Sequence, residues 1–156
     1  MADTVTVERD IAAPAAHLYE MVADLTRMGE WSPEAQGGEW IGGASGPALG
    51  AKFKGKNQRG WRKWSTTARV TDAEPGKQFA FVVTAPGGMK VAEWSYTFEP
   101  ADGACKVTES WIDLRNPVLR TVSQWVTGVT DRPAQNRTNM VITLDRLAAV
   151  AQRQPA

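Results

Sequence analysis

The chain has 156 residues, 42% of them hydrophobic and 22% charged, and a net charge of +1. This composition is typical of a globular protein, and the length suits one domain covering residues 1–156. It excludes an intrinsically disordered chain, and no stretch reaches the ~20 apolar residues that a membrane-spanning helix requires. The single cysteine and the single histidine also exclude a disulfide framework and a zinc site of the Cys/His type.

Export signals and cofactor motifs are not evident in the sequence. The chain opens with Met-Ala-Asp-Thr, which has neither a basic nor an apolar segment, so we expect a cytoplasmic protein. No Ser/His/Asp arrangement, phosphate-binding glycine loop or paired set of metal-binding carboxylates can be recognised. We therefore expect no cofactor and no metal ion.

Hydrophobic periodicity predicts a strand followed by two short helices at the start of the chain. Residues 4–11 alternate apolar and polar side chains, which is typical of a half-buried strand. Pro14 marks the start of a helix whose apolar residues recur at helical spacing, and residues 24–28 favour a second short helix.

The middle of the chain is predicted to be a meander of antiparallel strands. Eight of the 14 glycines lie between Gly37 and Gly60, which favours short strands joined by flexible turns there. Turn sequences such as Glu-Pro-Gly and Pro-Ala-Asp-Gly separate the strands that follow. The predicted strands cover residues 52–56, 62–72, 78–84, 90–99 and 104–113.

The last part of the chain is predicted to be a long helix. After Pro117 the apolar period changes from two residues to three or four, and Pro133 limits how far the helix extends upstream. The apolar stripe of this helix consists of Met140, Leu144, Leu147 and Ala151.

This order of elements resembles the helix-grip superfamily, also described as Bet v 1-like, START-like or SRPBCC, and within it the bacterial polyketide cyclase/dehydrase and lipid-transport group. The segments that carry the resemblance are Ile11-Ala-Ala-Pro14, Asp24-Leu with Trp31-Ser-Pro33, Gly50-Ala-Lys-Phe53, Val70-Thr-Asp-Ala-Glu-Pro75-Gly76, Trp94-Ser-Tyr-Thr-Phe98 and Asn139-Met-Val-Ile-Thr-Leu-Asp-Arg-Leu147. The resemblance implies an α+β fold in which a curved antiparallel sheet of about seven strands wraps around the C-terminal helix and encloses a ligand cavity. The group shares a cavity rather than a catalytic signature, so the resemblance indicates the fold more strongly than the activity.

Strand alternation predicts which side chains face that cavity. The even positions from Ala92 to Phe98 and the odd positions from Cys105 to Asp113 carry the more apolar face of their strands. Aromatic residues at this period ordinarily fill a core, but seven tryptophans in one domain favour a binding surface for a planar or polycyclic ligand. The predicted lining consists of Trp64, Thr66, Phe79, Phe81, Trp94, Tyr96, Phe98, Val107, Glu109, Trp111, Met140 and Leu144.

Glu109 and Tyr96 are the candidate catalytic residues. A carboxyl group among aromatic side chains has a raised pKa and could hold or move a proton, and the Tyr96 hydroxyl could donate to a ligand carbonyl. Buried charges ordinarily have partners, however, and Arg9 lies on the inward face of a strand that neighbours Glu109 in the resembled fold. We therefore prefer an Arg9–Glu109 ion pair, and core packing for Tyr96, as the structural alternatives.

A basic segment between Ala51 and Arg69 contains seven cations, no acidic residue, and Trp61 and Trp64. Cations interleaved with tryptophan are typical of surfaces that bind single-stranded nucleic acid or anionic lipid. The ordinary solvated face of a strand explains the alternation of its lysines better, so nucleic acid is a disfavoured partner.

The sequence therefore predicts that the chain binds a hydrophobic small molecule, aromatic or polyketide-like, in an internal cavity. Cyclisation or aromatisation of that ligand is the activity that the resemblance implies. The alternative function is that of a carrier or sensor of lipids or other small molecules without catalysis, and a homodimer stays open.

Overall fold

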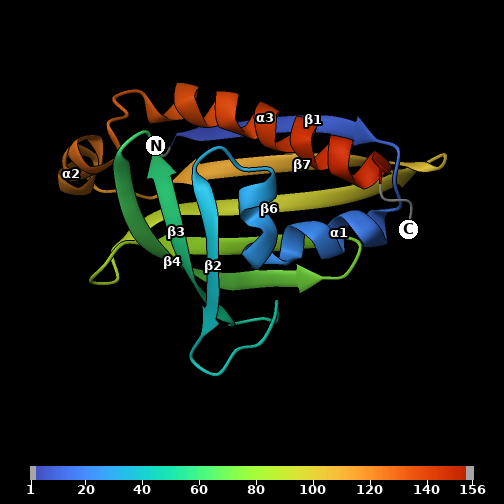
Figure 1. Cartoon of the computed structure of the whole chain (residues 1–156), viewed down its shortest axis with the longest axis horizontal. Coiled ribbons are helices and arrows are strands. Elements are labelled where there is room, and N and C mark those ends of the chain that lie inside the picture. Colours follow the sequence, from blue (N-terminus) through green and yellow to red (C-terminus); the bar gives the residue numbers. More distant parts are fainter. Residues whose placement is uncertain (1–2, 154–156) are drawn as a thin grey trace.

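Seven strands form a single antiparallel sheet in the computed structural model, which describes residues 3–153 (Figure 1). Each strand from β2 to β6 pairs with the next one along the chain, and β1 completes the sheet beside β7. The strands are β1 (Thr4–Ile11), β2 (Ala35–Ile41), β3 (Lys52–Arg59), β4 (Arg62–Glu74), β5 (Gln78–Thr84), β6 (Lys90–Ala101) and β7 (Ala104–Asp113).

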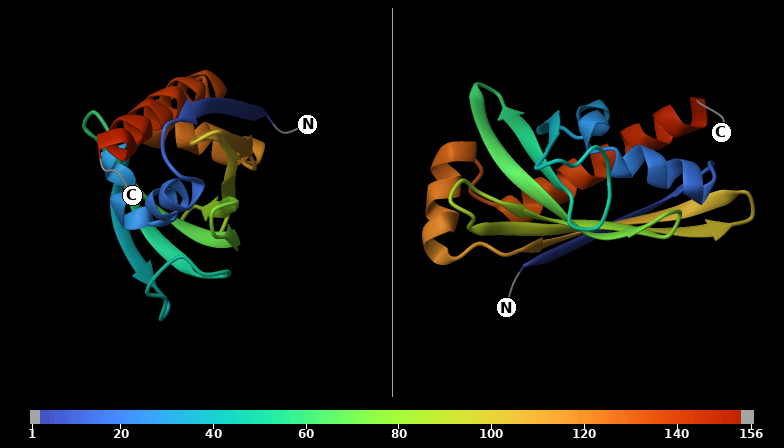
Figure 2. Two further views of the ribbon diagram at one scale, coloured as in Figure 1. Left: turned by 90° about the vertical axis from the view of Figure 1, so that its right-hand side faces the viewer. Right: turned by 90° about the horizontal axis from the view of Figure 1, so that it is seen from below.

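The helices lie on the concave side of this curved sheet (Figure 2). They are α1 (Ala15–Ala23), the 3₁₀ helix η1 (Leu25–Glu30), α2 (Pro117–Thr127) and α3 (Arg132–Arg153). The α+β helix-grip fold expected from the sequence is confirmed, including the two short helices after β1 and the long helix near the end of the chain. No helix within residues 3–153 is both long and apolar enough to cross a membrane.

Helix α2 is an element that the sequence analysis did not predict. Its start is defined by Asn116, whose side chain accepts a hydrogen bond of 2.7 Å from the Leu119 amide, and by Pro117 in the first turn. Its end is defined by Gly128, which adopts a left-handed conformation at φ 74°. Pro133 lies in the first turn of α3, so the predicted limit on the upstream extent of that helix is confirmed.

Close contact between β2 and β3 explains why a glycine is needed at position 38. Gly38 in β2 has φ +148°, and a Cβ atom added there would lie 2.0 Å from the Lys54 carbonyl oxygen of β3. The glycine lets the short β2 pair closely with β3 and complete the edge of the sheet that faces η1.

The predicted inward faces of the central strands are confirmed. In β7 every second residue from Cys105 to Asp113 is buried, and in β6 the even-numbered residues from Ala92 to Phe98 form the more buried set. The register brings the two rows together, because Trp94 is opposite Trp111 and Tyr96 is opposite Glu109. Their side chains therefore form one continuous inner wall.

One half of the space between the sheet and the helices is filled. Tyr19 of α1 packs edge-on against Phe79 and Phe98, with ring centroids 6.1 and 5.9 Å apart. The second half of α3 contributes Leu144 and Leu147, which are completely buried in the same cluster. These contacts make this half a closed core.

Replacing Leu144 with alanine should lower the free energy of unfolding by about 2–5 kcal/mol, because the deletion leaves a void in a closed core. Val141→Ala on the exposed side of the same helix is the matched control, and a change within about 0.5 kcal/mol is expected there. Urea denaturation of both variants measures the difference. Equal losses for the two would show that Leu144 does not pack as described.

Candidate functional site

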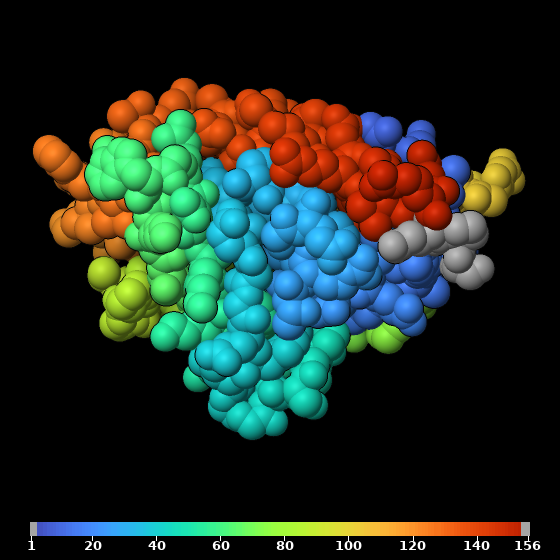
Figure 3. Space-filling view, in the orientation of Figure 1, coloured from blue at the N-terminus to red at the C-terminus, as the bar shows by residue number. Residues whose placement is uncertain are grey.

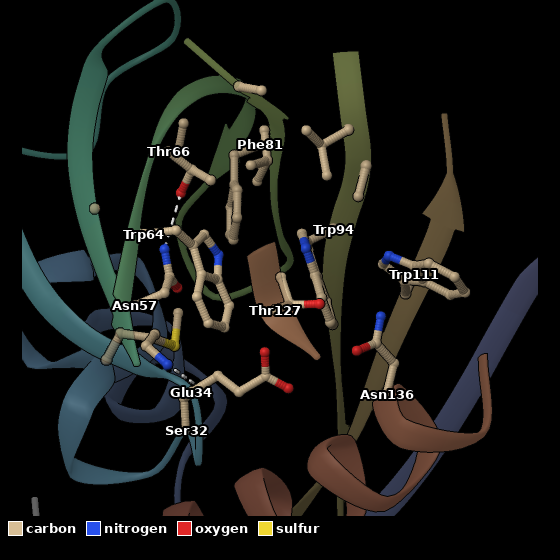
Figure 4. A pocket seen from close by; sticks show the side chains of 18 of the residues that line it. Ser32, Glu34, Asn57, Trp64, Thr66, Phe81, Trp94, Trp111, Thr127 and Asn136 are labelled. Carbon is tan, nitrogen blue, oxygen red and sulfur yellow. Dashed lines mark hydrogen bonds between the residues drawn. The ribbon is translucent and has the colours of Figure 1, made fainter. Parts of the chain in front are cut away.

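The other half of the space between the sheet and the helices is hollow. A cavity of about 720 Å³ lies between the sheet, the first half of α3, α2 and the segment from η1 to β2. This volume is in the range of small-molecule binding sites. Figure 4 shows Trp64, Phe81 and Trp94 around it, with the Glu34 carboxylate pointing into the same space.

Eight of the residues predicted to line a cavity lie in this wall: Trp64, Thr66, Phe81, Trp94, Tyr96, Glu109, Trp111 and Met140. The structure places the other four in the closed core instead: Phe79, Phe98, Val107 and Leu144. They share the inward faces of their strands and of α3 with the lining residues, but they lie further along those elements, where α1 covers the sheet. We therefore leave these four out of the proposed site.

Part of the lining comes from residues that the sequence analysis missed. Helix α2 contributes mostly apolar side chains. Helix α3, strand β3 and the residue just before β2 contribute amides and charged groups. The Asn-Pro pair before α2 and Gly128 after it are the signals that could have identified this helix. The main additions are Leu119, Val122, Val126, Thr127, Glu34, Asn57, Arg132, Asn136 and Asn139.

Tyr96 and Glu109 form a hydrogen-bonded pair at the boundary between the cavity and the core. The Tyr96 hydroxyl donates to Oε2 of Glu109 at 2.6 Å, and Glu109 is only 2% exposed. The other carboxyl oxygen, Oε1, is buried and has no hydrogen-bond partner among the described residues. The pair therefore leaves one oxygen of a buried carboxyl group unsatisfied.

The protonation of Glu109 follows from this environment. Burial raises its pKa from 4.5 to about 8, and the hydrogen bond from Tyr96 opposes this shift only in part. The carboxyl group is therefore mostly protonated at neutral pH. Because Oε2 accepts the hydrogen bond from the Tyr96 hydroxyl, we place the proton of the carboxyl group on Oε1.

The ion pair between Arg9 and Glu109 preferred in the sequence analysis is wrong. Val7 is the residue of β1 that lies opposite Glu109, and Arg9 lies opposite Val107. The Arg9 guanidinium instead pairs with Asp145 of α3 at the partly exposed side of the sheet. Arg9 thus stays near solvent, and Tyr96 is the hydrogen-bond partner of Glu109.

A second polar group of the wall joins Glu34, just before β2, to α3. Arg132 donates to both carboxylate oxygens of Glu34, at 2.9 and 3.0 Å, and Asn139 donates to Oε2 at 2.5 Å. Arg132 also donates to the Asn136 side chain at 3.2 Å. Glu34 is thus paired with a cation and hydrogen-bonded to an amide, whereas Glu109 has no cation partner.

Comparisons with known proteins agree with this architecture. A family model described as polyketide cyclase/dehydrase and lipid transport matches residues 2–152. The chain belongs to this family. No curated protein matches it significantly.

Solved structures show the same fold. The Polyketide_cyc-like protein Cgl2372 from Corynebacterium glutamicum is 30% identical, with a TM-score of 0.60, 97% of this chain and 90% of that chain covered. Ara h 8.0201 is 12% identical with a TM-score of 0.71, covering 99% of this chain and 100% of that one. The Aha1 protein from Colwellia psychrerythraea, described as a dimer, is 14% identical with a TM-score of 0.66 and 96% of both chains covered.

Asp113, whose partner Arg115 lines the cavity of this polyketide cyclase/dehydrase family member, is fully paired. Burial alone would raise the pKa of Asp113, but two hydrogen bonds of 2.9 Å from the Arg115 side chain, one from its backbone amide, and the nearby Arg120 hold the pKa below its ordinary value. The neutral, partly unsatisfied Glu109 therefore differs from Glu34 and Asp113, which are both paired with arginine.

Glu109→Gln should remove a pH dependence of folding stability. Because the folded-state pKa is about 8 and the ordinary value is 4.5, the wild-type protein loses stability relative to the variant as pH rises through this window. The difference is fully developed above pH 8 and is on the order of a few kcal/mol.

Urea denaturation of both proteins below, within and above the window measures this effect. Glu39→Gln, at an exposed position of β2, is the control and should follow the wild-type profile. Parallel profiles for wild type and Glu109→Gln would show that Glu109 is ionised in the folded protein.

Proposed function

We propose that the protein binds an apolar small molecule that carries a carbonyl group, and that protonated Glu109 donates a hydrogen bond to that carbonyl. The observation that carries the proposal is the buried carboxyl group whose Oε1 has no partner in the described part of the chain. A neutral carboxyl group with a free O–H offers a donor to a ligand acceptor at low desolvation cost, whereas an ionised one would not.

The remaining wall supports an aromatic or polycyclic ligand. Trp64, Trp94, Trp111 and Phe81 provide flat apolar surfaces, and the centroids of the Trp94 and Trp111 rings lie 6.5 Å apart. Elsewhere in the wall, the paired Glu34 and Arg132 offer a polar group to a ligand hydroxyl. A molecule with an apolar body and more than one polar group fits this distribution.

The more specific form of the proposal is the cyclisation or aromatisation of a polyketide-like substrate. In an aldol closure, an enol carbon attacks a carbonyl carbon, the carbonyl oxygen takes up a proton, and the enol hydroxyl releases one. Glu109 would supply the first proton and regain the second. Dehydration would use the same group, which protonates the leaving hydroxyl and then recovers the proton lost from the neighbouring carbon.

A carrier or sensor without catalysis is the second candidate function. Glu109 and Glu34 are the acidic residues of the lining, and Arg132 and Asn139 hold Glu34 as a paired carboxylate. A lining with one free acid and no separate free base favours binding over turnover.

The carbonyl requirement predicts that 2-acetylnaphthalene binds more tightly than 2-ethylnaphthalene, which has nearly the same shape. One hydrogen bond is worth about 1 kcal/mol, so the ratio of dissociation constants should be roughly three to ten. Quenching of tryptophan fluorescence measures both constants, since three tryptophans line the cavity. The preference should fall above pH 8, where Glu109 loses its proton.

Two variants test the role of Glu109 in this preference. Glu109→Gln keeps an N–H donor and should keep the preference at all pH values, whereas Glu109→Leu should bind the two compounds equally. Equal binding of the two compounds by the wild-type protein contradicts the proposed hydrogen bond, and no binding of either contradicts the ligand-binding function itself.

Catalysis can be separated from binding with a β-hydroxyketone that carries a naphthyl group and releases a fluorescent naphthaldehyde by retro-aldol cleavage. If Glu109 transfers the proton, the wild-type protein accelerates release and Glu109→Gln lowers the rate by about 10²- to 10⁴-fold with unchanged binding. Tight binding without acceleration would favour the carrier function.

A further inference from the structure

The end of the molecule at which the cavity opens carries an unusual set of exposed apolar side chains. Trp61 is 81% exposed in the β3–β4 turn and Trp125 is 79% exposed on α2. Val118 and Val122 of α2 and Met89 of the β5–β6 loop are also exposed. Helix α2, the β3–β4 turn and the β5–β6 loop lie at the same end of the molecule in two views (Figures 1 and 2). We call these five side chains the apolar rim.

The rim borders the mouth of the cavity. Val122 and Met89 belong to the cavity lining and are at the same time exposed, so the opening passes between α2 and the β5–β6 loop. In the space-filling view, α2 and the β3–β4 turn form adjoining parts of the surface at this end (Figure 3). An apolar ligand that enters the cavity therefore passes the rim.

Arg62 holds the two exposed tryptophans in place. Its guanidinium lies 4.6 Å from the centre of the Trp61 ring and donates a hydrogen bond to the Trp125 backbone carbonyl. The half-buried Arg62 thus connects the exposed Trp61 ring to the backbone of α2 at Trp125. This arrangement fixes the β3–β4 turn against α2.

Cations surround the rim. Arg59 and Lys63 flank the β3–β4 turn and are exposed, and neither forms an ion pair within the described residues. Arg120 of α2 is also partly exposed, with one contact of 3.4 Å to Asp113. Tryptophan and valine beside unpaired cations are the side chains that favour the interface of an anionic bilayer.

We propose that the apolar rim docks onto an anionic membrane surface. Trp61, Trp125 and Val118 enter the interfacial region, and Arg59 and Lys63 lie against the lipid phosphates. The rim is complementary to this partner in both polarity and charge. The inference goes beyond the proposed function, because binding of a ligand in the cavity does not require a membrane.

Co-sedimentation with vesicles tests the docking. The wild-type protein should bind vesicles of phosphatidylcholine with about a third phosphatidylglycerol more strongly than pure phosphatidylcholine vesicles, and salt should weaken the binding. The double variant Trp61→Ser/Trp125→Ser should lower the partition coefficient by roughly tenfold or more. Leu49→Ser, at an apolar residue that is 74% exposed on the β2–β3 loop, should leave it unchanged.

A second pair of variants tests the charge. Arg59→Gln/Lys63→Gln should lower the partition coefficient about tenfold and flatten its salt dependence. Lys52→Gln/Lys54→Gln, toward the other end of β3, is the matched control with the same change in net charge. Similar losses in both pairs would mean that net charge alone, and not the rim, drives binding, and would overturn the proposal.

The outcomes separate docking from ligand binding and from self-association. Binding of 2-acetylnaphthalene and the melting temperature should be unchanged in the Trp61→Ser/Trp125→Ser variant, which shows that it folds. Absence of vesicle binding by the wild-type protein overturns the docking and leaves the cavity proposal standing. A wild-type dimer in solution that dissociates in this variant would overturn it as well, because the rim would then bind a second copy of the chain.

Discussion

One helix cannot fill the concave face of a seven-stranded sheet, and the rest of the structure depends on this constraint. Helix α3 crosses the sheet, but only its second half is packed into a closed core, because α1 covers the sheet there with Tyr19. Its first half faces the cavity with Met140 and two asparagines. Helix α2 and the η1–β2 segment border this half without filling it, which leaves a space of about 720 Å³. The hollow is thus a consequence of where the short helices lie.

The chemistry of the site depends on where Glu109 lies relative to the boundary between the closed core and the cavity. It occupies the position at which the inner wall changes from core to cavity, and its partner is a hydroxyl group rather than a cation. A cation would have held the carboxyl group ionised, as Arg115 does for Asp113. Tyr96 can satisfy one oxygen without supplying a charge, so burial dominates and the proton is retained. The same fold therefore contains a neutral acid and a paired carboxylate only a few residues apart on one strand.

Strand alternation predicted the inner faces of β6 and β7 correctly, because period two is a local property of the chain. It could not predict that Phe79, Phe98, Val107 and Leu144 lie in the core, since that depends on how far α1 extends over the sheet. Nor could it choose a partner for Glu109. Arg9 has the right parity, but the register places it two residues away, and the Arg9 side chain reaches Asp145 of α3. The side of the sheet to which a residue points follows from local alternation. The residue that lies opposite it on the next strand is set by contacts between distant segments.

The seven tryptophans divide according to the three environments that this architecture creates. Trp31 is buried in the core and Trp40 packs against it, while Trp64, Trp94 and Trp111 line the cavity. Trp61 and Trp125 are exposed at the mouth, at 81% and 79%. Core packing explains the first two, and the proposed ligand explains the next three. Neither folding nor cavity binding explains the exposed apolar surface of the last two, whereas the proposed docking onto an anionic membrane explains both these tryptophans and the cations beside them.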